Sequence, residues 1–129
     1  FPKPLVNVCM WALTANTNEE AKYLFASRAA WKIGRNYGQL GSITDPDNAL
    51  SIINDNGWTE QYQNMYQNSL VGDANITKDK ISKLVEENNI DEIAILTWCH
   101  NENHRIKSYE IFANAFELSL KRETEKSVV

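Results

Sequence analysis

Two stretches of the chain are almost continuously apolar. The first is LVNVCMWAL at residues 5–13, and the second is DEIAILTWC at residues 91–99. Both are rich in residues that favour strands, and apolar side chains fall on both alternating faces. This pattern is typical of strands covered on two sides, as in a parallel sheet. The sequence therefore predicts two buried strands, one near each end of the chain.

A helix is predicted directly after the first strand. Thr17 followed by Glu20 forms a capping box, and the acidic residues at this point favour the first turn of a helix. The apolar stripe of this helix weakens at Arg28, and Gly34 is expected to end the helix. The first unit of the chain is thus a strand followed by a helix.

Residues 34–68 have a different character, which is typical of an insertion. Four of the five glycines fall between residues 34 and 58, where the pattern predicts a long loop with one short helix near Asn48–Asn54. A second short helix is predicted within residues 59–69. An insertion of this length is either a lid over a site or a poorly ordered excursion on the surface.

Two further helices flank the second predicted strand. Thr77 is expected to cap the earlier one, with Ile76 and Ile81 spaced as a hydrophobic staple and residues 88–89 at its end. Its buried stripe is Ile81, Leu84 and Val85. The later helix is amphipathic, with apolar positions at Ile106, Tyr109, Ala113, Phe116 and Leu120.

The order of elements is therefore strand, helix, short helices, helix, strand, helix. Two strands separated by helices indicate a parallel pair joined by a crossover, which is an α/β arrangement. Both strands have the pattern of doubly covered strands, yet no further strand is predicted to flank them. The predicted sheet is incomplete, and unpaired strand edges favour association with another chain.

Composition and charge restrict the possible partners. With 129 residues and 43% hydrophobic residues, the chain is long enough to bury a core. A net charge of −4, without a cluster of Lys or Arg, argues against nucleic acid. No apolar run is long enough to cross a bilayer, and none has the pattern of a secretory signal. We expect a cytoplasmic protein, since Cys9 and Cys99 lie in apolar runs without disulfide-like spacing.

The polar junction after the second strand is the first candidate for chemistry. Cys99, His100 and His104 suggest a metal site, but zinc requires three or four converging ligands and the only other cysteine is Cys9. The preferred interpretation is that Asn101 or Asn103 caps the last helix and that His100 faces solvent. We therefore predict no metal. The sequence also lacks the glycine motifs of serine hydrolases and of dinucleotide-binding folds.

Both ends of the chain resemble the luciferase-like flavin-dependent monooxygenases. An apolar strand in that family runs into an Ala-Asp-Thr-x-x-Glu-Ala helix start, which is similar to residues 15–21 here, with Asn16 in place of the usual Asp. The last crossover of the family resembles residues 70–116. The matching residues in this part are Val71, Gly72, Asp91, Glu92, Arg105, Ser108, Tyr109 and Glu110. Residues 34–68 match poorly.

The resemblance implies a (β/α)8 barrel of the TIM type, which needs about 250 residues. This chain would supply the last two βα units of such a barrel, with a helical insertion, so that the barrel is incomplete in this chain. Residues 1–33 would be a strand and helix, 34–68 the insertion, 69–120 a helix, strand and helix, and 121–129 a charged tail. The flavin-phosphate ligands and catalytic residues of the family come from earlier strands, so none is assigned here.

In such barrels the carboxyl ends of the strands face the active site. Five residues are therefore candidates for the rim of a pocket: Trp11, Thr14, Thr97, Trp98 and Cys99. Trp98 is the strongest of them, because a ring at a strand end can pack beside a flavin or an apolar substrate. A tryptophan buried in the core is the alternative. Arg105, Ser108 and Glu110 are expected to join the last helix to the end of the barrel.

The expected function follows from the resemblance. The chain would be part of an FMN-dependent monooxygenase that incorporates one oxygen atom from O2 into an organic substrate, and would be inactive by itself. Reduced FMN would bind to the intact enzyme and not to this chain alone. Its partners would be the rest of the barrel or a second copy of the chain, with a flavin reductase as a further candidate. The alternative is a self-contained, non-catalytic α/β interaction module.

Overall fold

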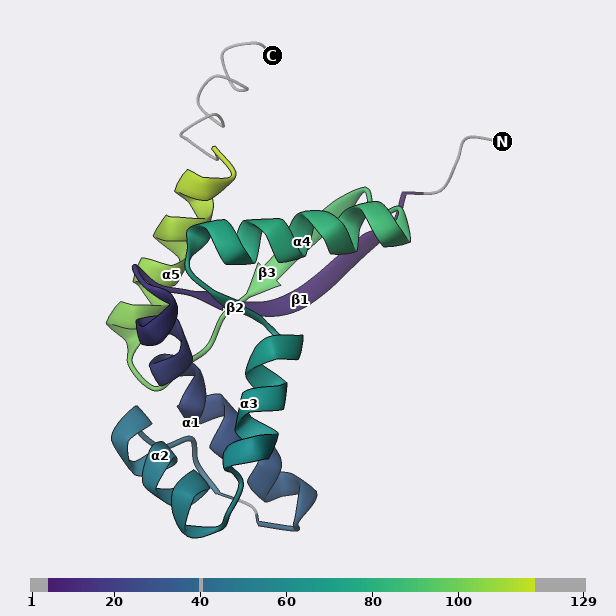
Figure 1. The fold of residues 1–129 in the computed structure, drawn as a ribbon. Coiled ribbons are helices and arrows are strands. Elements are labelled where there is room, and N and C mark those ends of the chain that lie inside the picture. The colour runs from purple at the N-terminus through teal and green to yellow at the C-terminus, as the bar shows by residue number, and fades with distance from the viewer. Residues whose placement is uncertain (1–4, 40, 118–129) are drawn as a thin grey trace.

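The computed structural model describes residues 5–39 and 41–117, which fold into an α/β structure with three parallel strands and five helices (Figure 1). In chain order these are β1 (Asn7–Thr14), α1 (Asn18–Asn36), α2 (Pro46–Asp55), α3 (Thr59–Asn68), β2 (Leu70–Gly72), α4 (Ala74–Asn88), β3 (Glu92–Leu96) and α5 (Glu102–Ala115). None of these helices combines the length and apolar character needed to cross a membrane, as far as the described residues extend.

The sheet has the strand order β2-β1-β3, with all neighbours parallel. β1 pairs with β3 along its first five residues, from Asn7 opposite Glu92 to Trp11 opposite Leu96. Its last three residues pair with β2 on the other edge. The prediction of two strands was therefore wrong by one. A strand of three residues is too short to establish an alternating pattern.

The two faces of β1 contact different helices. Ala12 is fully buried in a cluster with Ile81 of α4 and Phe112 of α5. Leu13, which points to the opposite face, belongs to a larger cluster that includes Phe25 of α1. α4 lies along one face of the sheet, and α5 stands beside it (Figure 1). The carboxyl-terminal half of β1 is therefore covered on both faces, as its sequence predicts.

The remaining helices form a separate layer beyond the carboxyl end of β1 (Figure 1). The two short helices predicted in the insertion are present as α2 and α3. The interpretation of residues 34–68 as a poorly ordered excursion was wrong, because its described residues pack against α1. They bury Ala49, Ile53, Trp58 and Tyr62 in the same cluster as Phe25.

Two predicted helix boundaries were also wrong. α1 does not end at the buried Gly34 but continues to Asn36, and Gly38 supplies the positive φ of 79° after it. α4 begins three residues before Thr77, because the side chain of Asp73 accepts a hydrogen bond from the Ile76 N–H at 2.9 Å. Ile76 is 41% exposed and forms no staple. The end at Asn88–Asn89 is confirmed.

α5 begins as predicted, but its buried stripe differs from the predicted one. Asn101 caps the helix by accepting hydrogen bonds from the N–H groups of Asn103 and His104. Ile106 is 48% exposed, whereas Ser108 and Phe112 are buried. The stripe is rotated because a serine hydroxyl faces β1, a role that apolar spacing cannot reveal. Leu120 and the charged tail lie outside the described residues.

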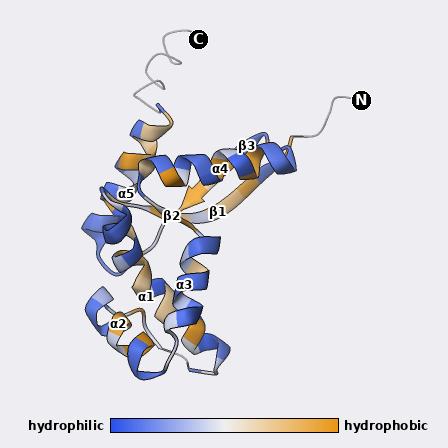
Figure 2. Ribbon diagram, viewed as in Figure 1, coloured by the Kyte–Doolittle hydropathy of each residue, from blue (hydrophilic) through white to orange (hydrophobic). Residues whose placement is uncertain are grey.

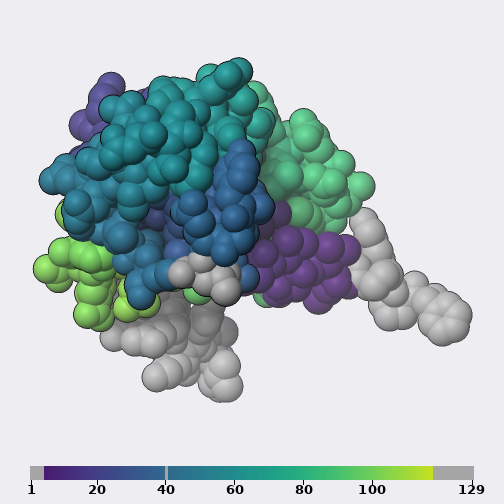
Figure 3. Space-filling view, turned by 90° about the horizontal axis from the view of Figure 1, so that it is seen from below, coloured from purple at the N-terminus to yellow at the C-terminus, as the bar shows by residue number. Residues whose placement is uncertain are grey.

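One face of the sheet is open over β3 and the first half of β1. Cys9 and Ala94 are exposed there, and Leu96 is 50% exposed. β3 is nevertheless coloured as hydrophobic in Figure 2. Figure 3 shows part of β1, in purple, at the surface of the molecule beside the blue helical segment. The expectation that both strands are covered on two faces is thus wrong for β3 within the described residues. We call Cys9, Ala94 and Leu96 the open face.

Candidate functional site

The three strands are parallel, so their carboxyl ends meet at one edge of the sheet. In parallel α/β folds this is the edge at which ligands bind. All five residues predicted for a pocket rim lie on β1 or within three residues of the end of β3. The structure places them in two groups: Thr14 and Thr97 are buried, whereas Trp11, Trp98 and Cys99 are partly exposed.

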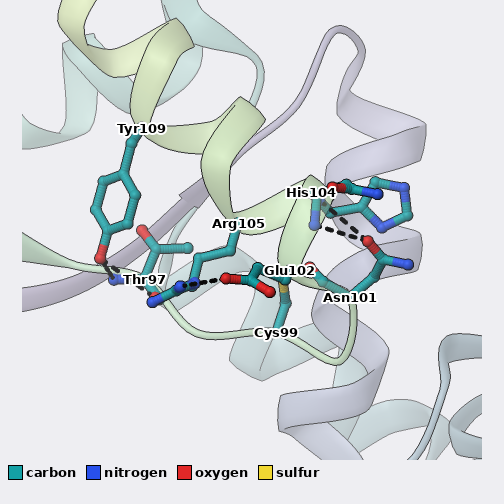
Figure 4. Close-up of polar contacts among 8 residues, drawn as sticks. Thr97, Cys99, Asn101, Glu102, His104, Arg105 and Tyr109 are labelled. Carbon is teal, nitrogen blue, oxygen red and sulfur yellow. Dashed lines mark hydrogen bonds and ion pairs between the residues drawn. The ribbon is translucent and has the colours of Figure 1, made fainter.

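Thr97 joins the two main strands to α5. Its hydroxyl donates a hydrogen bond to the carbonyl of Ala12 at 2.6 Å, and its N–H donates to the phenolic oxygen of Tyr109 at 2.8 Å. Figure 4 shows the Tyr109 side chain directed at Thr97. With both polar groups of Thr97 engaged and only 1% of the residue exposed, its role in this chain is structural.

Thr14 is held at the end of β1 by α5. Its N–H donates to the hydroxyl oxygen of Ser108 at 3.0 Å, and both residues are almost fully buried. This contact confirms the prediction that Ser108 ties the last helix to the sheet. The Thr14 hydroxyl has no hydrogen-bond partner among the described residues. Buried polar groups in proteins are normally paired, so this hydroxyl is an exception to the usual pattern.

Trp11 and Trp98 are brought together by Arg28, which in the sequence only interrupts the apolar stripe of α1. The guanidinium carbon of Arg28 lies 4.2 Å from the ring centroid of Trp11 and 4.7 Å from that of Trp98. Trp98 also meets Trp31 edge to face, with ring centroids 5.2 Å apart. α1 is thereby attached to the ends of β1 and β3 through aromatic and cation–π contacts. We call Trp11, Arg28, Trp31 and Trp98 the tryptophan cluster.

A charge inside an apolar stripe was the signal that could have identified Arg28. Charged residues are rarely buried without a partner, so an arginine in the middle of such a stripe indicates a specific contact. The contact itself depends on two tryptophans that are 87 residues apart in sequence, at positions 11 and 98. No local pattern specifies that these two rings approach each other.

Cys99 lies at the start of the polar junction and is half-buried. Its thiol contacts the carbonyl oxygen of Asn101 at 3.3 Å. Burial raises the pKa of the Cys99 thiol, while the carbonyl contact and the charge of Arg105 act in the opposite direction. Arg105 itself pairs with Glu102 at 3.4 Å (Figure 4). A raised pKa disfavours the thiolate, so Cys99 has the character of a wall residue and not of a nucleophile.

The polar junction between β3 and α5 is the place where a metal site was considered. No group of three or more His, Cys, Asp or Glu side chains in the described part of the chain is arranged to hold a metal ion. His100 is exposed, as predicted, and Asn101 is the helix cap. Cys9 and Cys99 are both free thiols. The junction is therefore a turn between a strand and a helix.

Known proteins resemble the chain in both sequence and fold, although no family model matches it. Two luciferase-like monooxygenases, from Escherichia coli strain K12 and from strain O6:H1 CFT073, are each 27% identical over 113 residues. These residues are 84% of this chain and 32% of each relative, so the chain spans about a third of the length of the curated relatives it matches.

The crystal structure of apo-MsnO8 shares the fold. It superposes with a TM-score of 0.77 at 20% sequence identity, covering 92% of this chain and 36% of that protein. The predicted α/β class of fold is therefore confirmed, and the match covers part of a longer chain. The predicted resemblance of this chain to the luciferase-like monooxygenases is confirmed.

Proposed function

We propose that this chain is the carboxyl-terminal portion of an FMN-dependent luciferase-like monooxygenase, contributing the last two βα units of a (β/α)8 barrel and a helical insertion. The observation that carries the proposal is the open face of the sheet, in a chain that matches about a third of its relatives. By itself the chain would be inactive, because the residues expected to bind the flavin phosphate and to catalyse the reaction lie outside it.

The arrangement of the two main strands supports this reading. In a (β/α)8 barrel the helices cover the outside, and side chains of the inward-facing positions fill the interior. Here α4 and α5 pack on one face of β1 and β3. Cys9, Ala94 and Leu96 point to the other face, which no layer formed by residues 5–39 and 41–117 covers. In the intact enzyme this open face would line the barrel interior.

The helical layer lies at the end of the sheet where such a barrel has its active site. α1, α2 and α3 pack together beyond β1, so that residues 15–68 would stand beside the mouth of the barrel. The position of these three helices fits a wall or lid of the active site better than an insertion on a distant surface. This layer would help to exclude water from the reacting groups.

The residues present fit one part of a flavin site. Trp11 and Trp98 offer indole rings at the strand ends, and both residues are partly exposed. The two rings would form an apolar wall beside reduced FMN, which supplies the reaction with O2 when it is bound. The wall would orient the organic substrate and keep water out. Thr97 would hold the two strands in register beneath it.

Several features of the intact enzyme complete the proposal. A flavin reductase would supply the reduced cofactor, and the cytoplasm is the compartment in which both would occur. A second copy of the chain is an alternative cover for the open face. The competing function is a non-catalytic interaction module, which the same open face would serve by binding another protein.

The decisive experiment compares this chain with the longer protein encoded by the same gene. If the proposal holds, the coding sequence ahead of Phe1 continues with alternating strands and helices, and the longer product consumes O2 when given reduced FMN. The 129-residue chain is expected neither to bind FMN stoichiometrically nor to consume O2. A coding sequence that starts near Phe1 would contradict the proposal and favour the interaction module. Tight FMN binding by this chain alone would also contradict the proposal.

A further inference from the structure

The guanidinium of Arg28 has unusual surroundings for a charged group. Trp11 and Trp98 contact it at 4.2 and 4.7 Å, and no carboxylate of the described residues lies within ion-pair distance. No hydrogen bond joins it to another described residue either. Arg28 is partly buried, and this desolvation lowers its pKa from the ordinary value. Among the described residues, the two indole rings are therefore the contacts that stabilise this charge.

The contacts of Arg28 leave its hydrogen-bonding capacity unused. Aromatic rings interact with the flat faces of a guanidinium, whereas its five N–H donors lie in the plane at its edge. Such a fork matches the two oxygens of a carboxylate, and partial burial strengthens the interaction because less water competes. The Trp11 indole N–H is a second buried donor in this cluster without an acceptor among the described residues.

The distribution of charge around the tryptophan cluster also favours the binding of an anion. The chain carries a net charge of −4, yet a second arginine lies beside the tryptophan cluster, since the Arg35 guanidinium is 4.8 Å from the Trp31 ring. Arg35 is exposed on the outer side of α1 and Arg28 faces the strand ends. A cation that lies at two strand ends and has no acidic partner among the described residues is suited to an anion that arrives from outside the chain.

We propose that Arg28 binds the carboxylate of an organic acid at the carboxyl ends of β1 and β3, with Trp11 and Trp98 holding the guanidinium in place. That this acid is the substrate of the monooxygenase rests on the proposed function. The anion site belongs to this chain and can be tested without flavin. A planar apolar acid fits the surroundings best, because its ring can pack against the neighbouring indoles.

The test uses the 129-residue chain, with benzoate as the probe and tryptophan fluorescence and titration calorimetry as readouts at constant ionic strength. We expect saturable binding of benzoate, which Arg28→Gln weakens at least tenfold. Arg28→Lys retains the charge and should still weaken binding several-fold, since an ammonium group has no planar fork. Arg35→Gln is the matched control, because it removes a second arginine stacked on an indole, and its effect should be less than threefold. Circular dichroism establishes that each variant is folded.

Four results with benzoate would overturn the proposal, and a fifth comes from a competing probe. The first four are the absence of saturable benzoate binding by the folded wild-type chain, unchanged binding by Arg28→Gln, full affinity in Arg28→Lys, and an equal loss in Arg35→Gln. Inorganic phosphate is the competing probe, and if it binds more tightly than benzoate, the assignment to a carboxylate is wrong. A longer protein without FMN-dependent O2 consumption would refute the proposed function and leave the benzoate result unchanged, so the two failures can be told apart.

Discussion

Replacing Ser108 by alanine tests how α5 is joined to the carboxyl end of β1. The Ser108 hydroxyl oxygen accepts the Thr14 N–H at 3.0 Å, where the two residues are 0% and 1% exposed. Alanine cannot accept this bond, and water cannot reach the N–H without opening the interface. A buried donor left without a partner costs about 1–3 kcal/mol. The free energy of unfolding of Ser108→Ala should therefore be lower by about 2 kcal/mol.

Urea unfolding followed by circular dichroism measures this loss. A two-state domain has a slope of roughly 1–3 kcal/mol per molar urea, so the midpoint should fall by about 1 M. The matched control is Ser51→Ala on α2, where an exposed hydroxyl donates to the Asp47 carbonyl at 3.2 Å. Its effect should stay within about 0.5 kcal/mol, as is usual for surface substitutions.

Amide exchange separates the proposed cause from a general loss of packing. If the lost acceptor is responsible, the Thr14 amide of Ser108→Ala exchanges faster than its neighbours on β1, in addition to the global destabilisation. Loss of packing alone would accelerate the whole strand together. A midpoint within error of the wild type, or an unchanged Thr14 amide, would refute the reasoning that this single hydrogen bond holds α5 to the strand end.

Three other predictions concern the thiols, α4 and the open face. Cys9 is exposed and should react with a thiol reagent faster than Cys99, because the raised pKa of Cys99 reduces its thiolate fraction at a given pH. In the denatured chain, Cys99 should begin to react at a lower pH. Equal reaction rates of the two thiols in the folded chain would contradict this prediction. Lys80→Met removes an ammonium that donates to backbone carbonyls at the end of α3 and in β2, with the shortest contact at 3.0 Å, and should lower the urea midpoint. Lys83→Met loses only an exposed ion pair and should change the midpoint little. Light scattering should give a mass above one chain at high concentration, and Leu96→Lys should return it to one chain; a wild-type mass of one chain would argue against pairing through the open face.

Local sequence signals predicted the starts of elements well where a side chain acts on its own backbone. The Thr17 hydroxyl accepts from the Glu20 N–H at 3.1 Å, and Asn101 caps α5, both as the sequence indicates. Thr77 failed as a cap because Asp73, four residues earlier, competes for the same role and its carboxylate is the stronger acceptor. The Thr77 hydroxyl instead donates to the Asp73 carbonyl inside the first turn.

Contacts between distant segments were beyond the reach of sequence patterns. The short strand β2 exists because residues 70–72 follow α3 and pass beside β1, and not because of their own alternation. The fate of the five predicted rim residues was likewise set by neighbours on other elements. Tyr109 and Ala12 occupy the polar groups of Thr97, whereas Arg28 draws Trp11 and Trp98 together. The sequence correctly indicated the edge of the sheet at which these residues lie. It did not indicate which of them are buried and which remain exposed.

The apolar sequence of β3 does not match the exposure of its side chains. Its residues Glu92–Leu96 are apolar at four consecutive positions, yet Ala94 and Leu96 are exposed while Ile93 and Ile95 contact the cluster beneath α4 and α5. A strand with one face in water ordinarily alternates between apolar and polar residues, and a strand covered on both faces does not. β3 thus has the sequence of a doubly covered strand and the surroundings of a singly covered one. The same holds at Cys9, its neighbour on β1 opposite Ala94. An apolar strand face of this kind has the sequence pattern of a covered face, and the described residues supply no layer that covers it.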